Sequence, residues 1–258
     1  MKQTSMFPKV TKDMLMIQLS WAGGFLGIVL LISIIKSFIS GIQGNDLEGY
    51  FSTIFIAGNI FMLVLGIIVI HFLPHYVGMG VTRKDYFLGA FLASLGITLF
   101  IPIVTIIITL LEQFLFHMMD FSYKVQTINE VNIKDNIIGD IVQSIIISPH
   151  IAPQDNWFLA AFVLSINILI YYLMGWLIGV SFYRLDVVAG LISIFSSIVL
   201  KMLKDTFLRI ALDLPAVGWF TFLDKFLPTG IAWVGILLVV IVTIQLIRKM
   251  TSRAPIKI

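Results

Sequence analysis

Six long runs of uncharged and mostly apolar residues follow one another along the chain, separated by short polar segments. A bilayer core is crossed by about 20 apolar residues in a helix, so five of these runs are long enough. The fifth run has 14 uncharged residues and spans the bilayer if Lys201 and Lys204 extend outward to the interface. The pattern predicts an all-α membrane protein of one domain, with six transmembrane helices at about residues 14–38, 51–73, 83–113, 156–183, 187–204 and 226–248.

Three segments outside these spans carry further expectations. The first residues hold three lysines and Pro8, which indicate either an amphipathic helix lying in the interface or a plain basic leader. The outer loop at 112–155 is polar and acidic, and it contains a short amphipathic stretch around Asn136–Ile147. The segment at 204–225 is apolar but interrupted by turn-forming residues, which favours a re-entrant hairpin over an external loop lying on the headgroups.

The composition agrees with a bilayer environment. The 258 residues are 59% hydrophobic and 12% charged, with a mean hydropathy of +1.03. Soluble domains carry about 25% charged residues. The absence of cysteine excludes disulfides, thiolate metal sites and cysteine nucleophiles. The first apolar run is longer than the core of a signal peptide, and no small-residue cleavage site follows it, so we expect it to be retained.

The basic residues predict the orientation of the chain. An even number of spans places both termini on one side, and short segments rich in Lys and Arg stay in the cytoplasm. The side of the termini carries 10 of the 17 basic residues, namely Lys2, Lys9, Lys12, Arg83, Lys84, Arg184, Arg248, Lys249, Arg253 and Lys257. Both termini are therefore expected in the cytoplasm.

Uncharged polar residues and glycines mark candidate packing or pathway positions within the spans. The polar candidates are Asn59, Asn167, Ser165, Thr105 and Thr109. Interhelical hydrogen bonds are the ordinary role of such residues, and one or two are candidates for lining a pathway. Two Gly-x-x-x-Gly pairs, Gly23 with Gly27 and Gly175 with Gly179, let helix backbones approach closely. They predict tight packing of the first and fourth spans, within or between subunits.

Several motifs of enzymes and ion-coupled transporters are missing from the sequence. No Gly-x-x-x-x-Gly-Lys-Ser/Thr phosphate loop occurs, so the chain has no such site for hydrolysing ATP. No His-Glu-x-x-His occurs, and the 4 histidines are not spaced with carboxylates as metal ligands. We therefore expect no metal site and no catalytic residue. The centres of the predicted spans lack charged residues, which disfavours transport driven by protons or sodium.

The cytoplasmic connector at 74–85 joins the second and third spans and holds several helix-breaking signals. Pro74 cannot continue the second span as a regular helix, because proline lacks the backbone N–H that the helix needs. Gly78 and Gly80 permit tight backbone turns. The connector is therefore expected to turn the chain sharply between two spans.

The second half of this connector predicts where the third span begins. Thr82 followed by Asp85 forms a capping box directly before an apolar run, so the third span is expected to start near Arg83. Arg83 and Lys84 are mildly unfavourable in the first turn of a helix, because the helix dipole is positive there. The pair is explained by the positive-inside rule, by contact with an acidic surface of a cytoplasmic partner, or by both.

At these residues the chain resembles the permease subunits of type 2 ABC exporters. The run from Gly80 to Ala90 is similar to the Gly-hydrophobic-Ser/Thr-Arg-Lys-x-x-Phe pattern that often follows their second span. In that family this loop carries a coupling helix that docks on a separate ATPase. An interfacial N-terminal helix and a re-entrant hairpin before the last span are also typical, and residues 3–16 and 204–225 fit those places.

The resemblance implies a permease subunit with a cytoplasmic ABC ATPase, a second permease of the same or a sister chain, and membrane lipids as partners. No nucleic acid partner is expected, and ATP and Mg would be bound by the ATPase. The ATPase contacts are then expected at His75, Tyr76, Met79, Val81, Thr82, Arg83, Lys84 and Tyr86.

The cargo class follows from the same resemblance. Small permeases of this kind look like those of Gram-positive bacteria that export amphipathic peptides such as bacteriocins or phenol-soluble modulins, or that confer immunity to them. The expected location is therefore a bacterial plasma membrane, and the cargo is a hydrophobic or amphipathic peptide, antibiotic or lipid-like molecule. The alternatives are a secondary transporter or a non-transporting scaffold, immunity or sensor-associated protein.

Overall fold

The computed structural model describes residues 5–43, 49–118, 148–215 and 220–256, and the regular elements in these ranges are helices. They are α1 (Phe7–Gln43), α2 (Tyr50–Val69), η1 (Ile70–Phe72), α3 (Leu73–Gly78), α4 (Arg83–Met118), α6 (Trp157–Arg184), α7 (Val187–Ala211), η3 (Thr221–Lys225) and α8 (Thr229–Thr251). Six helical segments in the described part of the chain are long and apolar enough to cross a membrane. The predicted all-α fold class is confirmed, and the chain is a multi-pass membrane protein.

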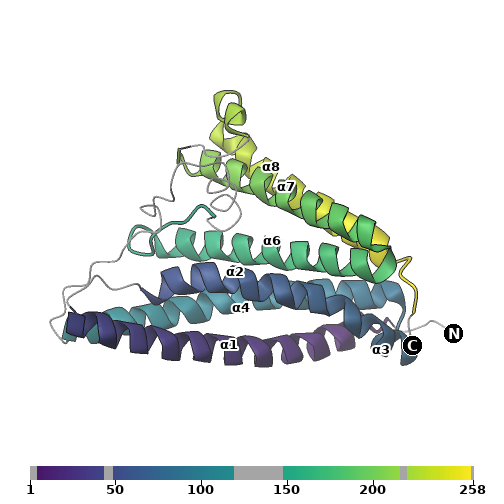
Figure 1. Cartoon of the computed structure of the whole chain (residues 1–258), viewed down its shortest axis with the longest axis horizontal. Helices are drawn as coiled ribbons and strands as arrows, with labels where there is room; N and C mark the ends of the chain where they lie inside the picture. Colours follow the sequence, from purple (N-terminus) through teal and green to yellow (C-terminus); the bar gives the residue numbers. More distant parts are fainter. Residues whose placement is uncertain (1–4, 44–48, 119–147, 216–219, 257–258) are drawn as a thin grey trace.

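The long helices form two groups. Helices α1, α2, α4 and α6 run alongside one another, whereas α7 and α8 form a pair that meets α6 at one end of the bundle and inclines away from it toward the other (Figure 1). We call the end that holds both termini the near end. The opposite end, where α2 and α6 begin, is the far end.

Helix α1 is one continuous helix of 37 residues, so the expected separate interfacial helix at residues 3–16 is wrong. Pro8 lies in its first turn, where a missing N–H costs nothing. No later proline or polar cluster interrupts the helix before the first span. At 1.5 Å per residue α1 is about 55 Å long, which exceeds the bilayer core of about 30 Å.

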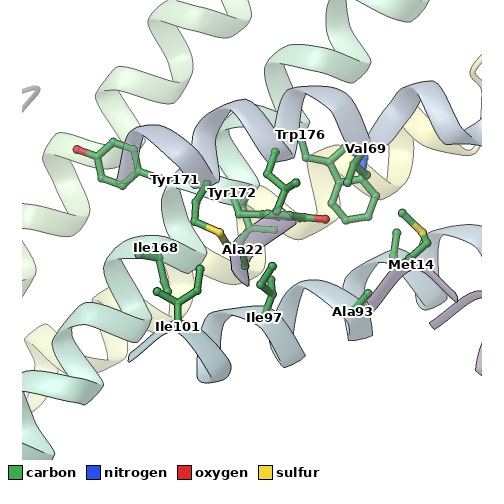
Figure 2. Close-up of a cluster of buried hydrophobic side chains, with 14 of the residues drawn as sticks. Met14, Ala22, Val69, Ala93, Ile97, Ile101, Ile168, Tyr171, Tyr172 and Trp176 are labelled. Atoms are coloured by element: carbon green, nitrogen blue, oxygen red, sulfur yellow. The ribbon is translucent and has the colours of Figure 1, made fainter. Parts of the chain in front are cut away.

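The core lies among α1, α2, α4 and α6. Figure 2 shows side chains from these helices meeting in one cluster, among them Met14, Ala22, Val69, Ala93, Ile97, Ile101, Ile168, Tyr172 and Trp176. A buried hydrogen bond from Gln18 Nε2 to the Tyr172 hydroxyl, at 2.8 Å, also joins α1 to α6.

Glycines bring the backbones of α2 and α6 together. A Cβ atom on Gly175 would lie 2.0 Å from the Leu63 carbonyl oxygen, and one on Gly179 would lie 2.6 Å from that of Ile67. These two glycines therefore permit the close approach that their spacing predicts. Gly23 and Gly27 on α1 have no neighbouring atom within 4 Å of an added Cβ. Tight packing of that pair within the chain is wrong, and packing between subunits stays a prediction.

Helix α7 is longer than the sequence pattern indicates. It runs from Val187 to Ala211, and the Asp186 carboxylate caps its first turn by accepting a hydrogen bond from the Ala189 amide. Lys201 and Lys204 are 1% and 0% exposed, so the expectation that they extend outward to the interface is wrong. They lie inside the span because both pair with the Asp205 carboxylate on the same helix.

The boundaries of the other segments differ less from the predicted ones. Helix α4 begins at Arg83 as predicted but continues to Met118, so residues 112–118 are not part of the outer loop. The Glu112 carboxylate accepts a hydrogen bond from the Tyr50 amide at 2.9 Å and thereby satisfies a free N–H at the start of α2. Residues 204–211 belong to α7, which contradicts the first part of the expected re-entrant segment at 204–225. The amphipathic stretch at 136–147 lies outside the described residues.

Candidate functional site

The connector at the near end begins with a break in the second span. Because Pro74 has no N–H, the helix changes to a 3-10 turn, in which the Leu73 amide bonds to the Ile70 carbonyl instead of the Val69 carbonyl. The hydroxyl of buried Tyr86 on α4 donates to the Val69 carbonyl. The break is therefore held by the next span, and the short helix α3 follows it.

The turn after α3 places the start of α4. Gly80 has a φ of 84°, a left-handed conformation that glycine adopts without strain. The Thr82 hydroxyl accepts a hydrogen bond from the Asp85 amide at 3.1 Å, which is the predicted cap. The Asp85 carboxylate does not complete the box. It accepts hydrogen bonds from the Ser5 hydroxyl at 2.7 Å and, more weakly, from the Met6 amide at 3.4 Å.

A second hydrogen bond ties the beginning of α1 to the connector. The Tyr76 hydroxyl on α3 donates to the Asp13 carboxylate at 2.7 Å. The predicted first span starts only at residue 14, so sequence reasoning missed this role of Asp13. Together with the Ser5–Asp85 bond, it makes the first turns of α1 part of the same unit as α3 and the start of α4. The short helix α3 is therefore joined to α1 by a hydrogen bond and to α2 and α4 by the chain itself.

The residues expected to contact an ATPase separate into two groups. His75, Met79, Thr82 and Lys84 are exposed at the near end, and Arg83 is half-buried. The other three, Tyr76, Val81 and Tyr86, are buried. Their expected role as contacts with a partner does not fit this burial, because their side chains pack inward and hold the connector in place.

A groove lies beside the connector, between α2 with α3 and the last turns of α6. Its volume is about 890 Å³, and its lining is mostly apolar, with two histidines and a tyrosine: Ile67, His71, Pro74, His75, Ile178, Gly179, Phe182 and Tyr183. The ring of His71 meets the edge of Tyr183 with centroids 6.1 Å apart. The groove opens beside exposed His71 and Phe182 and has room for an apolar chain at the near end of the bundle.

A buried charged cluster lies between α6 and α7 toward the far end. The Lys201 ammonium is 2.6 Å from the Asp205 carboxylate, and the Lys204 ammonium contacts the same carboxylate. Lys204 also donates a hydrogen bond to the Asn167 side-chain oxygen on α6. Sequence reasoning missed this cluster because it ended the fifth span at Lys204 and expected both lysines to extend outward to the interface. The spacing of Lys201, Lys204 and Asp205 in the sequence could have predicted the cluster, because it places all three on one face of a helix.

The residues just before α6, Ser148–His150, form a buried segment that we call the strap. The Ser148 hydroxyl lies 3.5 Å from the Asp205 carboxylate, and the Asn167 amide nitrogen lies 3.5 Å from the Pro149 carbonyl oxygen. His150 packs against α2, with ring centroids 5.1 Å from Phe55 and 6.0 Å from Phe51. The strap therefore links the charged cluster on α7 to both α6 and α2.

The strap should loosen in acid, because His150 is 3% exposed and neither ring nitrogen has a hydrogen-bond partner. Burial lowers its pKa from 6.5 to about 4, although nearby Asp155 acts in the opposite direction. The released strap binds a proton below about pH 6.5, whereas the packed strap resists protonation until about pH 4. Packing is therefore fully stable above pH 6.5 and loses about 3 kcal/mol as the pH falls to 4.

Protease sensitivity of the strap between pH 7 and 4 checks this expectation. His150→Phe should remove most of the pH dependence, since the ring then carries no proton. His117→Phe, at an exposed position on α4, is the matched control and should behave like the wild type. Equal pH profiles for the wild type and His150→Phe would contradict the assignment.

The polar residues predicted within the spans differ in their contacts. Thr105, Thr109 and Ser165 bond to the carbonyl four residues earlier in their own helix, so their expected interhelical bonds are wrong. Asn167 does link helices, through Lys204 and the strap. Asn59 on α2 is buried, and neither atom of its amide has a hydrogen-bond partner. It remains a candidate pathway residue.

The described residues contain no group of three or more His, Asp or Glu side chains that would hold a metal ion. Comparisons with protein-family models, with curated proteins and with solved structures find no match.

Proposed function

We propose that the chain is the membrane-spanning permease subunit of a type 2 ABC exporter, which moves a hydrophobic or amphipathic molecule using ATP hydrolysed by a separate subunit. The observation that carries the proposal is the connector. A helix break held by Tyr86 leads into the short helix α3, which exposes His75 at the near end. Met79 in the following turn and Lys84 on α4 are exposed as well. Such a short, exposed and anchored helix suits contact with a motor protein.

The hydrogen bonds around the connector support a mechanical role. Tyr76 ties α3 to Asp13 on α1, and Asp85 ties the start of α4 to Ser5. A push on α3 reaches α2 directly, and α2 is closely packed on α6 through the glycine contacts. ATP-driven closure of a motor would therefore move α1, α2, α4 and α6 as one body relative to the α7–α8 pair.

The proposal also covers location and partners. The near end faces the cytoplasm of a bacterium in this arrangement, because it carries most of the basic residues in short segments. A second permease, identical or a sister chain, completes the transporter. The groove beside the connector has the size and apolar lining for the hydrocarbon part of a cargo that enters from the cytoplasmic leaflet.

The test reverses the charge of the basic pair on the connector. Arg83→Glu with Lys84→Glu is expected to weaken association with the ATPase on the order of tenfold or more, because like charges meeting an acidic surface repel. Arg248→Glu with Lys249→Glu is the matched control, since this exposed pair lies at the same end on α8. The measurement is co-purification with a candidate ATPase subunit that carries the phosphate loop.

Two results of this experiment would contradict the proposal. One is the failure of any ATPase to co-purify with the wild-type chain. The other is an equal loss of association in the connector and control variants, because the effect would then come from the general charge of the near end. Membrane insertion of each variant is checked by labelling from either side.

The buried charged cluster favours one alternative, a secondary transporter. Sequence reasoning disfavoured ion coupling because no charge was expected inside a span, and Asp205 with Lys201 and Lys204 removes that argument. Reconstituted vesicles discriminate between the two functions. Transport that continues without ATP and stops when ionophores collapse the ion gradients would support the alternative.

A further inference from the structure

The α6–α7 seam at the far end contains a buried lysine that coupling to a motor does not explain. Lys204 on α7 is completely buried and bonds to Asn167 on α6 and to Asp205. Ionisable residues within spans commonly mark transport pathways. We propose that this seam is the far-end gate of the transport path, and that Lys204 receives the anionic group, a carboxylate or phosphate, of an amphiphilic molecule passing through it. The inference rests on the proposed transport function and names its cargo class.

The position of Lys204 suits a gate. It lies about 26 Å along α7 from Val187, so it is close to the far boundary of a bilayer core about 30 Å thick. Helices α6 and α7 diverge toward this end (Figure 1). The long lysine side chain joins the two helices in the half of α7 that lies toward the far end.

The closed seam is held by polar contacts from three segments. Lys204 reaches Asn167 across the seam, while the strap approaches both sides, through Ser148 near Asp205 and Pro149 near Asn167. Moving α7 away from α6 removes the amide acceptor from a buried ammonium group. The ammonium group then keeps only the Asp205 carboxylate and loses one charge-assisted hydrogen bond, so the closed seam is favoured until another acceptor replaces Asn167.

The charges on α7 indicate an anion as that acceptor. The far half of the helix carries Lys201, Lys204 and Arg209 with one carboxylate, Asp205, and these groups move together because they are on one helix. The facing side chain of α6, Asn167, is neutral. An arriving anionic group forms charge-assisted hydrogen bonds that are stronger than those of an amide. A cationic headgroup is repelled by the same helix.

The opening of the seam can be measured by spin-label distances. The chain has no cysteine, so labels are introduced without other changes at Phe158→Cys on α6 and Ile231→Cys on α8, both exposed toward the far end. Helix α8 reports the position of α7 because Phe207 packs against Gly235. In phosphatidylcholine nanodiscs, dodecyl phosphate is expected to add a longer-distance population, whereas dodecyltrimethylammonium and inorganic phosphate leave the distances unchanged.

Substitutions of Lys204 separate a gate from a merely structural contact. Lys204→Met is expected to show the longer distance without any additive and no response to dodecyl phosphate, while Lys204→Arg keeps the response. A second label pair, Ile60→Cys on α2 and Leu99→Cys on α4, joins two exposed positions on helices of the four-helix bundle, and its distance should not change. An unchanged control pair shows that Lys204→Met is folded.

Three outcomes would overturn the proposal. The first is a Lys204→Met distance distribution identical to that of the wild type. The second is equal opening by dodecyl phosphate and dodecyltrimethylammonium, which would mean that any amphiphile separates the helices. The third is opening by inorganic phosphate alone, which would assign the site to a free anion. Because no ATPase is present, a failure of ATPase association leaves this test unaffected, and the two proposals fail separately.

Discussion

Replacing Asp205 with asparagine is expected to lower the free energy of unfolding by about 3–5 kcal/mol, because two buried ammonium groups lose their shared carboxylate. Lys201 lies 2.6 Å from that carboxylate, and Lys204 contacts it as well. Both lysines are almost completely buried, so water cannot replace the lost partner. The unfolding midpoint in mixed detergent and dodecyl sulfate micelles, followed by circular dichroism, measures the loss.

A triple variant tests whether the cluster is there for stability. Lys201→Met, Lys204→Met and Asp205→Leu together remove all three charges and keep similar side-chain volumes. Buried ion pairs replaced in this way are often neutral or even stabilising, so the triple variant is expected to unfold within about 1 kcal/mol of the wild type or above it. A loss as large as that of Asp205→Asn would show that the ion pairs themselves stabilise the fold.

Stability and gating make different demands on this cluster. Apolar residues in place of all three charges would leave the fold at least as stable to unfolding, so stability alone does not account for charges at this position. A seam that opens toward water and closes again needs charged side chains that have hydrogen-bond partners in both states. The triple variant is therefore expected to be stable but unable to respond to dodecyl phosphate.

Much of the helical layout could be predicted because it depends on local signals. The apolar runs are long, and the bilayer requires each spanning segment to satisfy its own backbone hydrogen bonds. The cap at Thr82 identified Arg83 as the first residue of α4, because its hydroxyl satisfies an amide of the first turn. The break at Pro74 follows from the missing N–H in the same way.

The errors arose where contacts between distant segments decide the structure. Asp13 and Lys204 were both expected at a boundary of a span, because an unpaired charge does not remain within a span. Each lies inside a helix because a partner from elsewhere or from the same face satisfies it, Tyr76 for Asp13 and Asp205 for Lys204. The burial of Tyr86 could not be predicted from the local sequence either, because it depends on a hydrogen bond to the Val69 carbonyl of another helix.

The two Gly-x-x-x-Gly pairs look alike in sequence, yet alanine substitutions in them are expected to have opposite effects. Gly175→Ala with Gly179→Ala should lower the free energy of unfolding by about 2–6 kcal/mol in total, at 1–3 kcal/mol for each overpacked site. The added Cβ atoms would lie 2.0 Å and 2.6 Å from backbone carbonyl oxygens of α2, and backbone atoms cannot move aside as a flexible side chain can. Helices α2 and α6 would have to separate.

Gly23→Ala with Gly27→Ala is the matched comparison, because no atom lies within 4 Å of either added Cβ. Alanine is favoured over glycine within a helix by about 1 kcal/mol, so this variant should be as stable as the wild type or more stable. The same micelle titration measures both variants, and equal destabilisation of the two pairs would contradict the α2–α6 assignment. If the Gly23 and Gly27 variant instead keeps its monomer stability and loses self-association in crosslinking, these two glycines lie between permease subunits.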